Sequence, residues 1–288
     1  MVKEKTYSGK KLYQYITRKL KSVWGSETEA LSKYILKEIF NYNLTDFISE
    51  IPKKHSKIKL DQLNAIINRL ENQEPIQYIL GYTYFLDRRF IVTPDVLIPR
   101  PETEELVIWI RDKNNLNSPS ILDIGVGSGC IGVSLCLEIG VNKFTGLDCN
   151  QSITDIAVKN ARNMGVAMKT MNIDILHEEI PGPGYDIIVS NPPYVLPSEK
   201  SHMRKNVLDY EPVNALFVPE DKPLIFYHRI AEIAIGKLNR NGMLFFEINE
   251  SFSTKVKEVL QKWNFSSIEI KKDIHGKDRF VGGQMPYS

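Results

Sequence analysis

The strongest constraint on the fold is an alternation of apolar runs and helical patterns that begins at residue 98. Short apolar runs of this length, bounded by polar or glycine residues, are typical of buried strands. The runs expected to be strands lie at 120–124, 143–147, 169–173 and 185–190. Strands that alternate with helices favour a parallel sheet, so the sequence predicts an α/β fold for this half of the chain.

The same reading predicts the remaining elements of this half. Helices are expected at 102–111, 224–238 and 252–263, and further strands at 243–248, 266–272 and 278–282. Between the fourth strand and the next helix, residues 195–223 contain four prolines and little periodicity. A connection this long usually carries function, so we expect a loop or lid over a site.

The amino-terminal part has a different, helical pattern from Ser8 to about Arg69. Leu12, Ile16 and Leu20 recur at the spacing of one helix face, which predicts a small bundle. Asp46 and Asp61 are expected to cap helices, and residues 52–56 are expected to separate two of them.

A third pattern connects the two halves. Aromatic and β-branched residues dominate 82–85 and 89–92, which predicts a β-hairpin. We therefore expect an amino-terminal helical domain at 1–73, a hairpin linker at 74–97 and a larger domain at 98–288.

The first candidate site is Asn191-Pro192-Pro193-Tyr194, directly after the strand predicted at 185–190. Ligands of open α/β sheets bind at the carboxyl ends of strands. The two prolines fix the backbone and remove two donors, which leaves the Asn191 side chain and the Pro192 carbonyl as acceptors for a planar NH2 group. Tyr194 could pack on the face of that group. The alternative is a proline-rich turn without chemistry.

The second candidate site is Asp123-Ile124-Gly125-Val126-Gly127-Ser128-Gly129, where a strand runs into a glycine-rich turn before a helix. Glycines let a backbone approach a ligand closely. Asp148 ends the next strand about 20 residues on, where an acid can hold two ribose hydroxyls. The glycine pattern by itself also fits dinucleotide dehydrogenases.

Taken together, these motifs resemble the peptide chain release factor glutamine methyltransferase family over nearly the whole chain. The resemblance extends to Ile98-Pro99-Arg100-Pro101-Glu102-Thr103-Glu104, to Glu211-Pro212 with Ala215-Leu216, and to residues 73–81. It implies a Rossmann-like class I methyltransferase sheet and S-adenosylmethionine as cofactor. The implied reaction is methyl transfer to the side-chain amide nitrogen of the glutamine in the Gly-Gly-Gln motif of class 1 release factors.

The resemblance also implies roles for individual residues. The turn Gly125, Val126, Gly127, Ser128 and Gly129 would line the methionine and ribose, with Asp148 on the ribose hydroxyls and Asp123 on the methionine amine. Asp174 would meet the adenine amino group and Ile175 its ring, where relatives often have an aromatic residue. Catalysis and substrate binding would involve Asn191, Pro192, Pro193 and Tyr194, with Asn191 also beside the cofactor. Arg100 would extend toward substrate or cofactor, or form a surface salt bridge.

Three other classes of function share parts of this pattern. Adenine-specific DNA methyltransferases and ribosomal RNA guanine methyltransferases also present such a loop to an exocyclic amine. The third is a binding module with a vestigial cofactor pocket. No basic stripe with interleaved aromatic residues is evident, and 37 basic against 35 acidic residues give a net charge of +2, so a dedicated nucleic-acid binder is disfavoured.

Composition supplies the remaining expectations. No apolar stretch reaches membrane-spanning length and the first residues lack the apolar core of a signal peptide, so we expect a cytoplasmic enzyme. The three cysteines have no paired spacing, so we expect no metal site. Gly282-Gly283-Gln284 repeats the implied substrate tripeptide; we expect a flexible tail and a coincidence, with entry into the enzyme's own site as the alternative.

Overall fold

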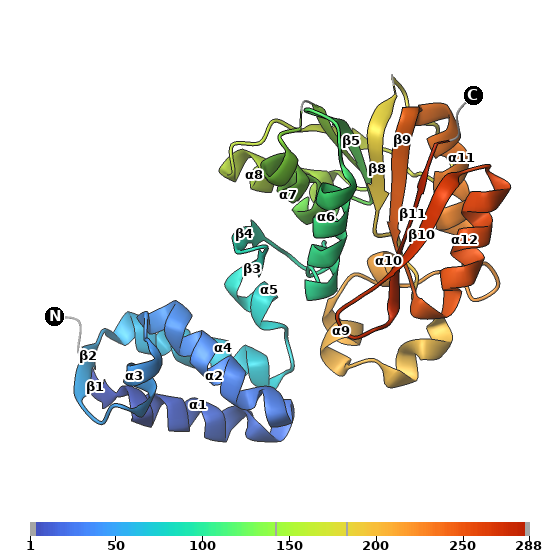
Figure 1. Ribbon diagram of the computed structural model, residues 1–288. Coiled ribbons are helices and arrows are strands. Elements are labelled where there is room, and N and C mark those ends of the chain that lie inside the picture. The colour runs from blue at the N-terminus through green and yellow to red at the C-terminus, as the bar shows by residue number, and fades with distance from the viewer. Residues whose placement is uncertain (1–3, 142, 183, 286–288) are drawn as a thin grey trace. The chain divides into compact units, whose positions relative to one another are not determined.

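The computed structural model describes residues 4–141, 143–182 and 184–285. Contacts within the chain divide it into two compact units (Figure 1). The first unit contains the residues up to Leu80 together with the segment Lys205–Tyr210. The second contains Gly81–Arg204 and the chain from Glu211 onward. The chain therefore passes between the units at three places.

The first unit is the expected helical bundle. Its elements are β1 (Lys5–Ser8), α1 (Gly9–Trp24), a 3-10 turn (Gly25–Glu27), α2 (Thr28–Phe40), α3 (Leu44–Ile48), β2 (Pro52–His55), α4 (Lys57–Glu71), α5 (Ile76–Leu80) and, from the later segment, α9 (Lys205–Tyr210). Leu12, Ile16 and Leu20 of α1 are buried in its core, as the helical spacing predicted. The Tyr210 hydroxyl of α9 donates a hydrogen bond to the Asn72 carbonyl (2.9 Å).

Two cap predictions for this unit were wrong, and the predicted separator at 52–56 is confirmed between α3 and α4. Asn43, not Asp46, caps α3. The Asn43 side chain accepts from Asp46 N–H, and the Asp46 carboxylate accepts from Asn43 N–H, which is a capping box. Asp61 lies inside α4, whose cap is Ser56. Residues 52–56 are more than a separator, because β2 pairs with β1 in an antiparallel ribbon.

The second unit is built on the predicted α/β sheet. Its seven strands have the order β10-β11-β9-β8-β5-β6-β7; β11 runs antiparallel to both its neighbours and the remaining pairs are parallel. The strands are β5 (Ser120–Ile124), β6 (Lys143–Asp148), β7 (Lys169–Asn172), β8 (Tyr185–Ser190), β9 (Leu238–Glu247), β10 (Ser266–Lys272) and β11 (Asp278–Gln284). A separate hairpin, β3 (Tyr82–Phe85) with β4 (Arg88–Ile91), confirms the expected pair of strands.

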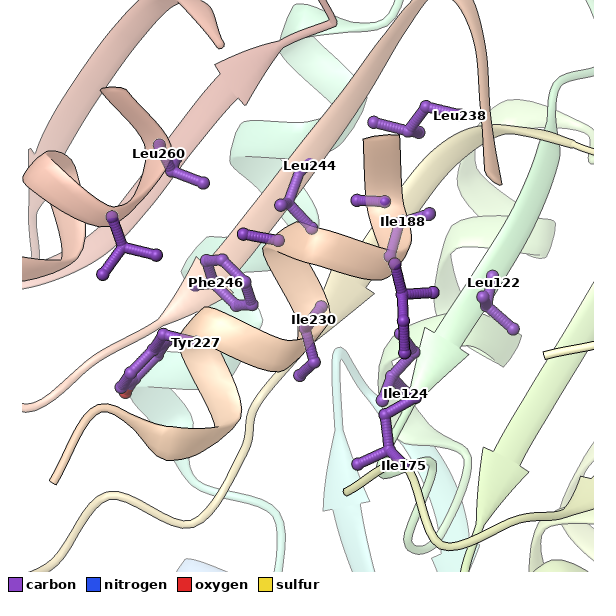
Figure 2. Close-up of a cluster of buried hydrophobic side chains, with 14 of the residues drawn as sticks. Leu122, Ile124, Ile175, Ile188, Tyr227, Ile230, Leu238, Leu244, Phe246 and Leu260 are labelled. Carbon is purple, nitrogen blue, oxygen red and sulfur yellow. The ribbon is translucent and has the colours of Figure 1, made fainter. Parts of the chain in front are cut away.

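Helices bury both faces of the sheet. Since strand side chains alternate, Leu122, Ile188 and Phe246 face one core, where Tyr227 and Ile230 of α11 pack (Figure 2). Ile121, Val189 and Phe245 belong to the opposite core. The helices are α6 (Pro101–Lys113), α7 (Cys130–Ile139), α8 (Gln151–Asn163), α11 (Ile225–Lys237) and α12 (Ser253–Lys262). Burial on both faces explains why the strands read as continuous apolar runs.

The connection 195–223 is more ordered than a plain loop. It contains a 3-10 segment (Pro197–His202), α9 and α10 (Val213–Leu216). Another short 3-10 turn (Glu250–Phe252) lies outside this connection, between β9 and α12. Val195 N–H donates to the Leu216 carbonyl (2.9 Å), and Val218 N–H donates to the Val195 carbonyl (3.0 Å). Both ends of the connection are thereby fastened together.

The flexible tail expected at Gly282-Gly283-Gln284 is contradicted by the structure. These residues lie in β11, paired with Phe245, Leu244 and Met243 of β9. A Cβ added at Gly282 would lie 2.8 Å from the Phe245 ring and 2.9 Å from the Trp109 ring, so close packing requires glycine there. The tripeptide is explained by the sheet.

Candidate active site

Two loops lie side by side at one edge of the sheet. Strands β5 and β8 are parallel neighbours, with Ile124 opposite Ser190. The Ser190 hydroxyl donates to the Ile124 carbonyl (2.7 Å), which locks the two strand ends together. The turn that begins at Gly125 therefore meets the segment that begins at Asn191, and a Cβ added to Gly125 would lie 4.0 Å from the Asn191 carbonyl oxygen.

The glycine-rich turn has a backbone that only glycine adopts easily. Gly125, Gly127 and Gly129 have φ values of +74°, +51° and +80°. The N–H groups of Gly125 and Val126 both donate to the Leu147 carbonyl of β6 (2.9 Å each), and Gly129 N–H donates to the Val126 carbonyl (2.7 Å). The turn then continues into α7. These main-chain bonds shape the turn, and the Cα positions of Gly125 and Gly127 stay clear, since a Cβ added to either would meet no atom closer than 4.0 Å.

Asp148, at the end of β6, is joined to this turn. Its carboxylate accepts from Gly127 N–H (3.1 Å) and from Cys149 N–H (2.9 Å). Burial raises the pKa of Asp148, and the two backbone hydrogen bonds oppose that rise. The structure thus places an oriented carboxylate beside the turn.

Asp123 is almost fully buried, with 1% of its surface exposed. One oxygen accepts from Gly132 N–H (3.0 Å), whereas the other has no hydrogen-bond partner among the described residues. Burial raises the pKa of the Asp123 carboxyl well above its ordinary value, and the charge of Asp148 adds to the rise. The neighbouring Ser128 and Thr145 hydroxyls are likewise buried and unpaired within the described residues. Such groups suit a ligand that brings hydrogen-bond donors.

The segment after β8 presents a polar group between rigid neighbours. Pro192 is buried, while Asn191 and Pro193 are half-buried. Within the described part of the chain, no hydrogen bond engages the Asn191 amide. An amide held beside two prolines and left without a partner is available to a ligand.

Tyr194 is anchored by a carboxylate that the sequence reading missed. Its hydroxyl donates to one oxygen of Glu247 at the end of β9 (3.0 Å), and the Thr103 hydroxyl of α6 donates to the other (2.7 Å). Burial raises the pKa of Glu247, and these two bonds oppose the rise. Burial and the Glu247 charge raise the pKa of Tyr194, which keeps the phenol protonated as a donor. An acid directly after the apolar run 243–246 was the available signal.

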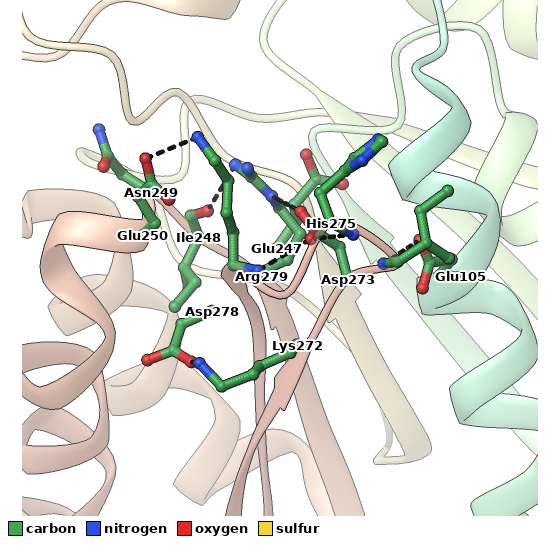
Figure 3. Close-up of polar contacts among 12 residues, drawn as sticks. Glu105, Glu247, Ile248, Asn249, Glu250, Lys272, Asp273, His275, Asp278 and Arg279 are labelled. Carbon is green, nitrogen blue, oxygen red and sulfur yellow. Dashed lines mark hydrogen bonds and ion pairs between the residues drawn. The ribbon is translucent and has the colours of Figure 1, made fainter.

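A charged cluster lies next to Glu247 (Figure 3). The Arg279 Nε donates to Asp273 (3.1 Å), which also accepts from the N–H groups of His275 (2.9 Å) and Lys277 (3.0 Å). The positive charge of Arg279 lowers the pKa of Glu247 against the effect of burial. The cluster therefore fixes the β10–β11 turn and offsets part of the cost of the buried carboxylate.

Arg100 forms an ion pair rather than pointing freely into the site. Its guanidinium donates to Glu211 (2.7 Å), and the second Glu211 oxygen accepts from Ile98 N–H (3.3 Å). Glu211 is buried, so the pair fastens the connection 195–223, at Glu211, to the segment before α6. Two of the motifs behind the sequence resemblance meet in this contact.

Asp174 and Ile175 lie beyond β7, and their side chains have structural partners. Asp174 accepts from Leu176 N–H (3.0 Å) and from His177 Nδ1 (2.8 Å), which makes a local turn. Ile175 is 7% exposed and packs in the core of Figure 2, so a nucleobase could reach only its remaining edge. Asp148 is bonded to Gly127, whereas the hydrogen bonds described for Asp174 are all to residues 176–178.

Comparison with known proteins identifies the family. Residues 104–209 match the Methyltransferase small domain, and residues 11–81 match the PrmC N-terminal domain. The chain is 41% identical to the release factor glutamine methyltransferase of Flavobacterium psychrophilum, over 88% of this chain and 91% of that protein. It is also 41% identical to the enzyme of that name from Bacteroides thetaiotaomicron, over 93% and 96% of the two chains. The chain belongs to the release factor glutamine methyltransferase family.

Solved structures confirm the fold expected for a release factor glutamine methyltransferase. A methyltransferase from Pyrococcus furiosus aligns with a TM-score of 0.51 at 14% identity, covering 78% of this chain and 98% of that one. A 16S rRNA N2 G1207 methyltransferase from Thermus thermophilus, solved with AdoMet and guanosine, aligns with a TM-score of 0.50 at 14% identity, over 71% and 50% of the chains. The Rossmann-like sheet predicted from the sequence is thereby confirmed.

Two features are absent from the part of the chain that the structure describes. None of the described helices combines the length and apolarity needed to cross a membrane. In the same residues, no three His, Cys, Asp or Glu side chains are grouped so as to hold a metal ion.

Proposed function

We propose that the protein transfers a methyl group from S-adenosylmethionine to the side-chain amide nitrogen of the glutamine in the Gly-Gly-Gln motif of class 1 release factors. The observation that carries this proposal is the juxtaposition of Asn191, whose amide has no partner among the described residues, with the open glycine turn 125–129. Family membership supplies the substrate class. Because release factors act in translation, we expect the enzyme to work in the cytoplasm.

The buried polar groups of the site support S-adenosylmethionine as the cofactor. The unpaired oxygen of Asp123 fits the ammonium of a methionine moiety, and the oriented carboxylate of Asp148 fits two ribose hydroxyls. Glycines at 125, 127 and 129 permit contact with the backbone between them, including Val126 and Ser128. When bound, the cofactor supplies an electrophilic methyl group on a sulfonium. Asp174 and Ile175 remain our prediction for the adenine end.

The protein's task in this reaction is to orient a weak nucleophile. An amide nitrogen shares its lone pair with the carbonyl, so it attacks poorly. The Asn191 side-chain oxygen and the Pro192 carbonyl would each accept one N–H of the substrate amide. Those two bonds strengthen as the nitrogen gains positive charge, so they stabilise the transition state more than the ground state.

Tyr194 and Pro193 would complete the substrate pocket. The hydroxyl of Tyr194 is held by Glu247, which leaves the ring as a fixed wall for the flat substrate amide. The site needs no general base, because the proton leaves readily once the nitrogen carries the methyl group. Arg100 would act on the substrate through the connection that it fastens at Glu211.

We infer that the first unit, which contains the whole of the predicted domain 1–73, recognises the release factor. The second unit contains every residue proposed for chemistry. The first unit carries Leu44, Ile48 and Ile51, whose exposed fractions are 78%, 75% and 73%. Large apolar side chains this exposed and this close in sequence are typical of a surface that binds another protein.

The test is a methylation assay with four possible acceptors: a release factor, the same factor with its Gly-Gly-Gln glutamine changed to alanine, duplex DNA and ribosomal RNA. Mass spectrometry locates the methyl group, and Asn191→Ala is the control for the site. We expect modification of the glutamine of the unmodified factor alone. A methyl group on DNA or RNA would keep the cofactor assignment and overturn the substrate assignment.

A further inference from the structure

A buried asparagine on α8 touches both the hairpin and the glycine turn. Asn160 has no exposed surface, although asparagine is a poor helix former and costly to bury without partners. Its Oδ1 accepts from Ile91 N–H (2.7 Å). Its Nδ2 donates to the carbonyls of Ile91 (2.9 Å) and Ser128 (2.9 Å). Both of its amide hydrogens are therefore used.

The two bonds to Ile91 resemble strand pairing. Ile91 is the last residue of β4 and lies opposite Tyr82 of β3. By donating to its carbonyl and accepting from its N–H, the Asn160 amide does for β4 what a neighbouring strand would do. This contact fixes α8 against the edge of the hairpin.

The third bond acts on the glycine turn. Ser128 and Gly129 share the peptide that closes the turn before α7, and Gly129 has a φ of +80°. One helical turn before Asn160, Ala157 packs so closely that a Cβ added to Gly129 would lie 3.3 Å from its side chain. Helix α8 thus supports two successive residues of the turn, one by a hydrogen bond and one by packing.

Few side chains share this role. Within the described residues, two side chains hydrogen-bond the backbone of 125–129: Asp148 accepts from Gly127 N–H, and Asn160 donates to the Ser128 carbonyl. Asp148 is proposed to bind the ribose, so it serves the cofactor directly. Asn160 lies behind the turn and has no free donor left for a ligand.

We propose that Asn160 is a positioning residue for the cofactor: by holding the Ser128 carbonyl against the hairpin edge, it keeps the glycine turn in the conformation that binds S-adenosylmethionine. This inference rests on the proposed function, which assigns the turn to that cofactor. A purely structural asparagine would contribute to stability without changing the affinity of the folded protein. The two roles predict different measurements.

The test is calorimetric titration of S-adenosylmethionine into wild type, Asn160→Ala and Val259→Ala, at a temperature where circular dichroism shows each to be folded. Val259 is also buried, in α12, and belongs to a different core from Ala157 and Ala161 of α8, so it controls for a general loss of stability. We expect Asn160→Ala to raise the dissociation constant at least tenfold, with kcat at saturating cofactor within about threefold of wild type. Val259→Ala should change neither value more than twofold.

Asn160→Asp is the second variant, for use if Asn160→Ala does not fold. It keeps the size of the side chain and the acceptor for Ile91 N–H, but it replaces both donated bonds with an oxygen facing two carbonyls. A folded Asn160 variant with a dissociation constant within twofold of wild type would refute the positioning role. Asp148→Ala separates the two proposals: if it weakens binding while the Asn160 variants do not, only this inference fails, whereas failure of wild type to bind removes the proposed function as well.

Discussion

The two loops at the active edge of the sheet are held in place in opposite ways. The turn 125–129 after β5 is shaped by main-chain hydrogen bonds, with Gly125 and Val126 both bound to the Leu147 carbonyl. The segment 191–194 after β8 is shaped by proline rings and by a side-chain bond from Tyr194 to Glu247. The conformation of the first loop depends on glycines, which have no side chain, and that of the second depends on the side chains of its prolines and of Tyr194.

This difference separates binding from chemistry. A backbone surface can contact any cofactor of the right shape, and a substitution there acts by adding atoms. Specific side chains orient one reacting group, and a substitution there acts by removing atoms. Changes in the first loop should therefore alter cofactor affinity, and changes in the second should alter the rate of methyl transfer.

The largest effect is expected for Asn191→Ala. Loss of one acceptor for the substrate amide should lower kcat by about 10³-fold, the upper range for removing one preorganised hydrogen bond in a site. Affinity for S-adenosylmethionine should stay within threefold, measured by calorimetry beside single-turnover kinetics. Equal losses of affinity and rate would show that cofactor binding and methyl transfer are not assigned to separate loops.

Gly127→Val tests the other loop. Its φ of +51° is strained for any residue with a Cβ, and the strain is expected to cost about 1–3 kcal/mol. Cofactor affinity should fall by about 10–100-fold, since each 1.4 kcal/mol is a factor of ten. Gly140→Val is the matched control, because Gly140 has a φ of +65° at the opposite end of α7. A similar loss of affinity in both variants would point to stability alone.

Tyr194→Phe removes the hydrogen bond from the Tyr194 hydroxyl to Glu247 that holds the segment 191–194 in place. It leaves one oxygen of the buried Glu247 without its donor, which should lower the free energy of unfolding by about 1–3 kcal/mol. We expect kcat to fall about tenfold as the ring loses its fixed orientation. Tyr227→Phe is the control, since the Tyr227 hydroxyl donates to the Glu247 main-chain carbonyl (3.2 Å) and not to the loop. Equal rates in the two variants would exclude a role for the anchor in catalysis.

A smaller loss of affinity than that of Gly127→Val, about fivefold, is expected for Asp123→Asn, which removes one charge from a hydrogen-bonded contact. In wild type, burial raises the pKa of the Asp123 carboxyl in the folded state. Its contribution to stability is therefore complete below the ordinary carboxyl pKa and is lost as pH rises. Without the cofactor, Asp123→Asn should have the higher free energy of unfolding at neutral pH, and the difference should shrink on acidification. Urea unfolding at several pH values measures this, and a difference that grows in acid would contradict it.

The sheet could be predicted because every central strand is an apolar run that ends in a polar or glycine motif. Strand pairs that are short and polar could not: β1 and β2 contain Lys5, Lys53 and Lys54, and nothing local indicates that they pair. Sequence reading placed the caps of α3 and α4 on acidic residues, whereas Asn43 and Ser56, at the positions before each helix, fill that role.

Much of the candidate site was visible in the motifs, but the residues behind them were not. Thr103 and Glu247 are 144 residues apart and meet only in the folded chain. Asn160 lies beside the buried Ala157 and Ala161 of α8. A polar residue at a position that faces the core was a signal, but a reading of hydrophobic periodicity considers only the apolar residues. Supporting residues of this kind depend on contacts between distant segments, which one sequence does not reveal.

The segment Lys205–Tyr210 gives the two units an unusual connectivity. Because α9 belongs to the first unit while the residues on both sides of it belong to the second, the units are interlaced along the chain rather than arranged one after the other. A protease that cuts only between Leu80 and Gly81 would leave α9 on the second fragment, joined to the first unit by non-covalent contacts alone. A gene shortened to begin at Gly81 would encode a catalytic unit carrying α9, with the Tyr210 hydroxyl deprived of its Asn72 acceptor. Separating the two units therefore requires both a new first residue for the second unit and a segment that replaces α9 in it.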